Sequence, residues 1–204
     1  LWYQAGGMQV IHGGLVARGS SGIFFGGGSG AGKSTCALSC LSAGLDYLSD
    51  DHVGLEELPD GSFVGHSMFS STRVEPDHLE RFPVLRKHGI ASNHPTNDKA
   101  LVLVAEVLPH RIRRHVPISA VVLPRIVNAD GARVLPASKA ETLRLIAPTS
   151  LFMIPPQPGR DGFEKLARLV QRVPTYWLEI GRDLDAIAPR VNDLFTVLET
   201  SSEG

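Results

Sequence analysis

The feature that most constrains this chain is a glycine-rich segment between an apolar run and a helix-forming run. Gly27–Ser34 reads Gly-Gly-Ser-Gly-Ala-Gly-Lys-Ser and satisfies the pattern G-x-x-x-x-G-K-[ST]. Before it, Gly22–Phe25 is short, apolar and bounded by glycines, which is typical of a buried strand. After it, Lys33–Ala43 favours helix, and Gly44 stands where a helix end favours glycine. The sequence therefore predicts a strand, the loop and a helix in that order, which is the context in which this pattern indicates a phosphate-binding loop.

A loop of this kind binds phosphates because its glycines allow backbone N–H groups to turn inward. The following helix adds the partial positive charge of its N-terminus. Lys33 supplies a cation to the phosphates, and Ser34 offers a hydroxyl to a bridging Mg²⁺. We therefore predict bound ATP and Mg²⁺, with Ser34 as a metal ligand; the alternative is a glycine-rich turn that binds nothing. The predicted nucleotide contacts are Gly28, Ser29, Gly30, Ala31, Gly32, Lys33, Ser34 and Thr35.

Two adjacent carboxylates follow the next predicted strand. Leu45–Ser49 ends in Asp50 and Asp51, which should lie at the same sheet edge as the phosphate loop. Because neighbouring strand residues point to opposite faces, we assign Asp50 to the metal and Asp51 to an acceptor hydroxyl as base. The later strand Ile118–Leu123 ends without the acid that many P-loop ATPases carry there, which favours transfer over hydrolysis. The alternative is a solvated Asp-Asp turn.

The order of His12-Gly13, the phosphate loop, Gly44 and Asp50-Asp51 resembles the catalytic core of the HPr kinase/phosphorylase family and of related serine kinases. Spacing as well as order matches over about the first third of the chain. The resemblance implies that His12 helps to place phosphate or acceptor. It also implies that the aspartate pair serves acid–base and metal functions where a protein serine is received. Taken alone, a histidine in an apolar strand is more often a core residue.

The same resemblance implies an α/β fold, a P-loop kinase core with a mixed β-sheet that is related to phosphoenolpyruvate carboxykinase. It further implies a homo-oligomer and, in many members, a separate N-terminal domain. We expect residues 1–204 to be the single catalytic domain, with such an N-terminal domain missing. Two departures from the family are plain. Lys33-Ser34 is followed by Thr35 where HPr kinase has glutamate, and no arginine-glycine-leucine-glycine sequence follows the acids.

The segment His66–Lys99 is polar, carries several histidines and shows no sustained period, which is typical of functional loops. We place the acceptor side of the site here. Arg73 and Lys99 are predicted to contact the transferred phosphate or an acidic acceptor, and the alternative is ordinary solvated charge.

Several further elements follow from period and turn chemistry. They are a strand Met8–Val16, a hairpin of Val53–Leu58 with Ser62–Gly65, a strand Ala100–Val107, a helix from Ser138 through Ile146, a helix Phe163–Arg172, a strand Thr175–Ile180 and a helix Leu184–Leu198.

Composition excludes some classes of function. The net charge of -1 gives no overall positive field for nucleic acid or an anionic membrane, so neither is expected as a partner. No apolar run reaches the roughly 18 residues that span a bilayer, and we expect a cytoplasmic protein. Cys36 and Cys40, one helical turn apart, are expected to be free structural thiols.

Three functional hypotheses remain open. The first is an ATP-dependent kinase of a serine in a protein or peptide, including a biosynthetic precursor peptide. A P-loop kinase of a small alcohol or sugar would use the same phosphates and acids. A nucleotide-sensing module would bind ATP without transfer, although sensing alone requires no base.

Overall fold

The computed structural model describes residues 7–90, 99–151 and 159–201, and its fold is organised around the long strand β9 (His115–Ile126). In one part of the sheet β9 lies between two parallel neighbours, β3 (Ser21–Phe25) and β11 (Thr175–Ile180). Three strands extend this part by antiparallel pairing: β2 (Gly14–Arg18), β4 (Asp46–Ser49) and β10 (Ala132–Pro136). The first residues of β9 pair instead with β6 (Phe63–Ser67). This strand begins an antiparallel series that continues through β5 (His52–Glu57) to β1 (Gln9–His12).

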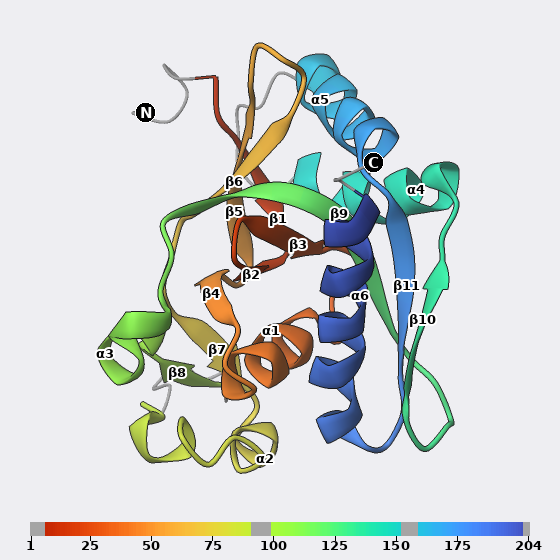
Figure 1. Ribbon diagram of the computed structural model, residues 1–204. Helices are drawn as coiled ribbons and strands as arrows, with labels where there is room; N and C mark the ends of the chain where they lie inside the picture. Colours follow the sequence, from red (N-terminus) through yellow and green to blue (C-terminus); the bar gives the residue numbers. More distant parts are fainter. Residues whose placement is uncertain (1–6, 91–98, 152–158, 202–204) are drawn as a thin grey trace.

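Helices cover both faces of the sheet (Figure 1). Because side chains alternate along a strand, Ala120 and Val122 of β9 face one core cluster, whereas Val121 and Leu123 face the other. The first cluster is completed by α1 (Lys33–Ser42) and α6 (Ile187–Ser201), and the second by α4 (Lys139–Leu151) and α5 (Gly159–Arg172). The sheet is therefore the middle of three layers.

A smaller unit of short elements lies beside α1 (Figure 1). Its two-stranded sheet pairs β7 (Thr72–Val74) with β8 (Ala100–Val102). The short helices α2 (Pro76–Leu79) and α3 (Val104–Val107) flank this sheet. Single 3₁₀ turns occur at Arg86–His88, Pro109–Arg111 and Leu184–Ala186.

The topology brings four strand ends to one edge of the sheet. The strands β3, β9 and β11 are mutually parallel. The strand β4 runs in the same direction, because β2 lies antiparallel between β3 and β4. The residues that follow β3 and β4 are the phosphate loop and Asp50-Asp51, so these two motifs meet at the carboxyl edge, where open α/β sheets bind ligands.

Most predicted elements are confirmed, with corrections that have physical reasons. The predicted strand Met8–Val16 is two strands divided at Gly13, where a Cβ would lie 2.4 Å from the Phe25 carbonyl oxygen. The second half of the predicted strand Ala100–Val107 is the short helix α3. The helix after Ser138 begins as predicted, with Ser138 Oγ accepting from the Glu141 N–H at 3.2 Å, but it runs on through Pro148.

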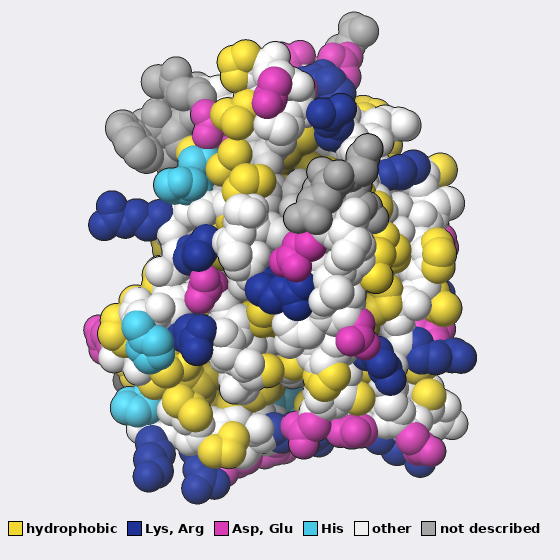
Figure 2. All heavy atoms as spheres, viewed as in Figure 1, with side chains coloured by type: hydrophobic (Ala, Val, Ile, Leu, Met, Phe, Trp, Pro, Cys, Tyr) yellow, Lys and Arg dark blue, Asp and Glu magenta, His cyan; other side chains and the backbone are white. Residues whose placement is uncertain are grey.

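The surface carries charge of both signs. On the face that Figure 2 shows, basic and acidic side chains are interspersed without a large area of one sign. Within the described ranges, no helix has the length and apolar character needed to cross a membrane. Cys36 and Cys40 are buried in the core against α6 and are not bonded to each other.

Candidate active site

The phosphate loop follows β3 directly and depends on glycine at three positions. Gly27, Gly30 and Gly32 have φ angles of 124°, 75° and 104°, a region that other residues rarely adopt. Gly32 is also crowded, since a Cβ there would lie 2.8 Å from the Cδ1 atom of Ile180. The glycines of the loop are thus required by positive φ angles and, at Gly32, by the close approach of the backbone to Ile180 at the end of β11.

The helix α1 starts with an open N-terminus. Gly32 is the N-cap, no side chain caps it, and the first turn contains no acidic residue. The positive end of the helix dipole is therefore available to an anion. Lys33 folds back over the loop, where Nζ donates to the carbonyl oxygens of Gly27 at 3.1 Å and Gly28 at 2.8 Å. Burial lowers the pKa of Lys33, and the neighbouring Asp50 and Asp51 carboxylates oppose that shift.

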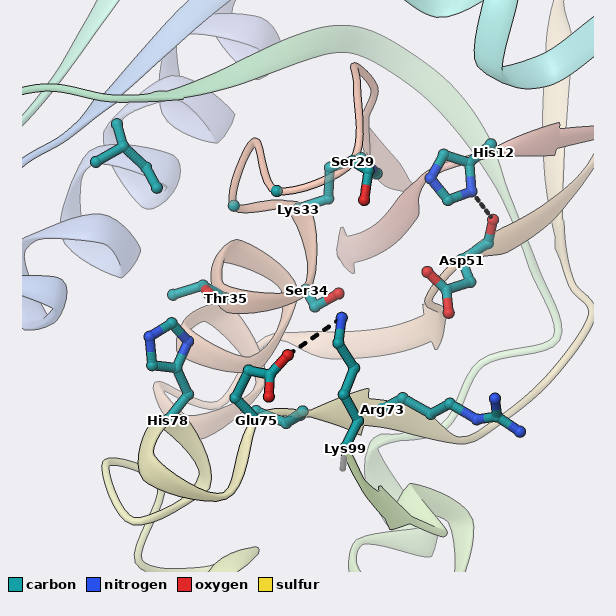
Figure 3. Close-up of a pocket in the computed structure, with 14 residues that line it drawn as sticks. His12, Ser29, Lys33, Ser34, Thr35, Asp51, Arg73, Glu75, His78 and Lys99 are labelled. Atoms are coloured by element: carbon teal, nitrogen blue, oxygen red, sulfur yellow. Dashed lines mark hydrogen bonds and ion pairs between the residues drawn. The ribbon is translucent and has the colours of Figure 1, made fainter. Parts of the chain in front are cut away.

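A cavity of about 230 Å³ opens over this loop (Figure 3). One side, here called the loop wall, is formed by residues of Ser29–Thr35. The opposite side, here called the β7 wall, is formed by Arg73, Val74, Glu75, His78 and Lys99. His12 and Asp51 lie together at one end, and Thr35 and His78 lie at the other (Figure 3).

Asp50 is a buried acid with an incomplete set of partners. Its side chain is 3% exposed, and its Oδ2 accepts from the Thr72 hydroxyl at 2.7 Å. Burial and the Asp51 charge raise the pKa of Asp50, while the Thr72 and Ser34 hydroxyls lower it. Even so, Oδ1 has no hydrogen-bond partner among the residues that the structure describes, although buried carboxylate oxygens nearly always have one. Oδ1 faces Gly14, since a Cβ at Gly14 would lie 3.7 Å from it.

Asp51 has an unusual backbone and directs its carboxylate into the cavity (Figure 3). Its φ of 66° makes it the non-glycine residue with positive φ in the described chain, a conformation that costs energy and is often found at active sites. The Asp51 carbonyl accepts from the Gly13 N–H at 3.1 Å and from His12 Nδ1 at 2.8 Å. The predicted strand alternation is therefore wrong here, because a turn after Ser49 separates the two carboxylates.

The contact with Asp51 fixes the state of the His12 ring. A carbonyl oxygen can only accept, so Nδ1 carries the hydrogen and Nε2 of the neutral ring keeps its lone pair. Burial, followed by the charge of Lys33, lowers the pKa of His12 below 6.5. The lowered pKa favours the neutral ring, which holds the Asp51 backbone through Nδ1.

The β7 wall supplies basic groups from two separate segments. Arg73 is exposed on β7, and Lys99 lies immediately before β8, the strand paired with β7. Lys99 Nζ and Glu75 Oε1 are 3.8 Å apart, and both side chains are about half exposed (Figure 3). The wall thus offers charges of both signs to the cavity.

The structure brings most of the predicted site residues together. The cavity is lined by His12, Ser29, Gly30, Gly32, Lys33, Ser34, Thr35, Asp51, Arg73 and Lys99. Gly28 and Ala31 line a neighbouring cavity on the other side of the loop, and Asp50 is buried below the surface.

Sequence reasoning missed five residues at the site: Thr72, Val74, Glu75, His78 and Ile126. Thr72 and Val74 are buried on either side of exposed Arg73, an alternation that could have indicated the short strand β7.

The residues present fit a magnesium ion. Asp50 Oδ1 is a buried carboxyl oxygen without a hydrogen-bond partner among the described residues, and a hydrogen bond from the Ser34 hydroxyl lowers the Asp50 pKa. No cluster of three or more His, Cys, Asp or Glu suited to a metal occurs among the described residues. Mg²⁺ in phosphoryl-transfer sites takes one or two protein ligands and completes its shell with phosphate and water, so Asp50 and Ser34 would be the protein ligands.

Comparison with known proteins leaves the function open. No protein-family model matches the chain, and no curated protein does. Among solved structures, the HPr(Ser) kinase/phosphatase from Coxiella burnetii matches with a TM-score of 0.49 and 11% sequence identity. The match covers 96% of this chain and 95% of that chain.

Proposed function

We propose that this chain is an ATP- and magnesium-dependent phosphotransferase with a hydroxyl group as acceptor. One observation carries the proposal: a single cavity is lined by the phosphate loop and by the carboxylate of Asp51. A phosphate-binding loop alone would fit a nucleotide sensor as well. A strained acid beside the same loop adds a group that can accept a proton.

The loop wall would bind the phosphates of the nucleotide. Its N–H groups and the open N-terminus of α1 attract negative charge, and Lys33 would exchange the carbonyls of Gly27 and Gly28 for phosphate oxygens. Asp50 and Ser34 would hold Mg²⁺, which when bound neutralises charge on the phosphates.

Asp51 would act as the base. As the acceptor oxygen forms its bond to the γ-phosphorus, the hydroxyl proton passes to the Asp51 carboxylate, and the bond from phosphorus to the β,γ-bridging oxygen breaks to release ADP. His12 would act as a positioning residue, because Nδ1 holds the Asp51 carbonyl at 2.8 Å. Arg73 and Lys99 would meet the transferred phosphate or acidic groups of the acceptor.

We further propose that the acceptor hydroxyl belongs to a serine of a protein or peptide, for example a biosynthetic precursor peptide. An aromatic series leads outward from His12, whose ring centroid is 6.4 Å from that of His52; the centroids of His52 and Phe69 are 5.8 Å apart. Phe69 is 55% exposed although it is large and apolar. An exposed aromatic beside an active site suits a peptide chain better than a small alcohol.

The test is transfer of label from γ-labelled ATP and Mg²⁺ to a panel of HPr, serine-containing peptides, and sugars or alcohols. Label on a serine supports the proposal, and label on a small molecule alone would limit it to alcohol phosphorylation. Tight ATP binding without label on any acceptor would favour a sensing module and would contradict the proposed reaction.

A further inference from the structure

A second cavity, of about 280 Å³, adjoins the first beside the N-terminus of α1. The two cavities share Gly32, Thr35, His78 and Ile126. The second one, here called the β11-end cavity, is completed by side chains at and after the end of β11 and by one arginine from the segment after α2: Arg81, Ile180, Gly181, Arg182 and Leu184.

The arrangement of the first cavity indicates what the second receives. Asp51 lies at one end, Ser34 and Lys33 lie in the middle, and Thr35 lies at the far end (Figure 3). A phosphate chain whose terminal group faces Asp51 therefore continues past Thr35. Because Thr35 also lines the β11-end cavity, the group attached to the other end of that chain enters this cavity.

The lining suits a flat, largely apolar ring system. Ile126, Ile180 and Leu184 supply apolar surface, and Ile126, at the end of β9, is 70% exposed. Arg182 is held in place by the Asn128 side chain, with Nη2 donating to Oδ1 at 2.8 Å. A guanidinium group stacks readily on aromatic rings, so Arg182 and the apolar surface together fit a nucleobase.

A third cavity, of about 310 Å³, lies on the other side of the phosphate loop and is the competing position. It is lined by Leu145, Trp177 and, like the other two cavities, Ile126, and it touches Gly27–Ala31, but Lys33, Ser34 and Thr35 are not among its lining residues. The Trp177 ring is already covered on one side, since the Arg125 guanidinium carbon lies 4.5 Å from the ring centroid. The geometry therefore favours the β11-end cavity.

We infer that the β11-end cavity binds the nucleoside part of the phosphate donor, so that the donor is a nucleoside triphosphate and not an inorganic polyphosphate. This inference rests on the proposed function, because it takes the phosphate loop as the site of the phosphates. It adds a binding site for the base and ribose formed by Ile126, Ile180, Arg182 and Leu184.

The experiment compares two ligands, ATP and inorganic tripolyphosphate, each with Mg²⁺, by calorimetric titration of the full chain. Leu184→Ser and Leu145→Ser form a matched pair, because both leucines are half-buried and each lines one of the competing cavities. Arg182→Gln adds a variant at a side chain that is 74% exposed, which protects the test against misfolding of Leu184→Ser. Melting temperatures report the folded state of each variant.

We expect Leu184→Ser and Arg182→Gln to weaken ATP binding by about tenfold and to leave tripolyphosphate binding unchanged, because only the nucleoside contacts are lost. Leu145→Ser should change neither. The inference is overturned if Leu145→Ser alone weakens ATP binding, or if wild-type protein binds both ligands equally well. Wild-type protein that binds neither ligand would overturn the phosphate-loop assignment, and with it the proposed function.

Discussion

The two walls of the cavity are built in opposite ways. The loop wall belongs to one continuous segment of strand, loop and helix. Its Lys33 is 6% exposed and donates hydrogen bonds to carbonyl oxygens of the loop. The β7 wall combines a three-residue strand, a four-residue helix and Lys99, which is distant in sequence; the side chains of Glu75 and Lys99 are about half exposed. Backbone N–H groups whose directions are fixed by glycines with positive φ suit a ligand that does not vary, such as phosphate. Exposed side chains on short elements can change without disturbing the core, which suits a variable acceptor.

The largest effect should come from breaking the loop wall. Lys33→Ala removes the cation beside the loop, and we expect ATP affinity and transfer to fall by about 10²- to 10³-fold. Calorimetry with ATP and a transfer assay measure the two effects. Lys87→Ala, on the 3₁₀ turn Arg86–His88 and outside the cavity lining, is the control and should behave as wild type. Equal ATP affinity in Lys33→Ala and wild type would show that this wall does not bind phosphate.

Substitution in the β7 wall should change KM for the acceptor and leave the affinity for ATP unchanged. Arg73→Ala is expected to raise KM for the acceptor by about tenfold while the affinity for ATP stays unchanged, because Arg73 belongs to the β7 wall, which we propose meets the acceptor. Steady-state kinetics with each substrate varied in turn separate the two. Arg114→Ala, which is exposed and lies outside the cavity lining, serves as control. A loss of ATP affinity in Arg73→Ala would contradict the division of roles between the walls.

Asp50 is buried beneath the loop wall, and its charged form should lower the free energy of unfolding. Burial raises its pKa, so the unfolded chain loses this proton at lower pH than the folded chain does. The free energy of unfolding contributed by Asp50 therefore falls as pH rises through the folded pKa. Asp50→Asn keeps an acceptor for the Thr72 hydroxyl and removes the buried charge.

We expect Asp50→Asn to raise the free energy of unfolding at neutral pH by about 1 kcal/mol and to abolish magnesium-dependent transfer. Urea unfolding at several pH values tests the first point, and the gain over wild type should shrink as pH falls. Asp77→Asn, at an exposed position of α2, should show no such pH dependence. A variant less stable than wild type at every pH would count against a buried, incompletely partnered carboxylate.

The smallest effect is expected at the exposed ion pair of the β7 wall. Glu75→Gln removes the carboxylate that lies 3.8 Å from Lys99 Nζ, and exposed ion pairs contribute little to stability. The free energy of unfolding should change by less than about 0.5 kcal/mol, and salt should screen even that difference. Urea unfolding at low and high salt measures it. A large, salt-independent loss would mean that this wall is more rigid than its exposure indicates.

The same contrast explains what could be predicted from sequence. The phosphate loop, its strand and its helix are local, so the glycine pattern of Gly27–Gly32 and the position of Gly44 predicted them closely. The β7 wall depends on tertiary contacts between segments whose sequences have no regular hydrophobic period. Nothing in the sequence indicated that Glu75 and His78 belong to the site.

The aspartate pair lies between these extremes. The sequence placed both acids at the correct edge of the sheet, but their separation comes from the positive φ of Asp51 and from the hold of His12 on its carbonyl. Neither can be deduced from strand alternation. Ile126 was missed for a related reason, since the predicted strand ended at Leu123 and the actual strand continues to the cavity.

The central claim is that the loop wall and Asp51 act on one phosphate group, and transfer from γ-labelled ATP tests it most directly. Wild type, Asp51→Asn and the control Asp77→Asn would be assayed with the acceptor panel, alongside ATP binding. The account predicts label on an acceptor hydroxyl, a loss of about 10²- to 10⁴-fold in Asp51→Asn, and nearly unchanged ATP affinity. Transfer by Asp51→Asn at the wild-type rate would contradict it.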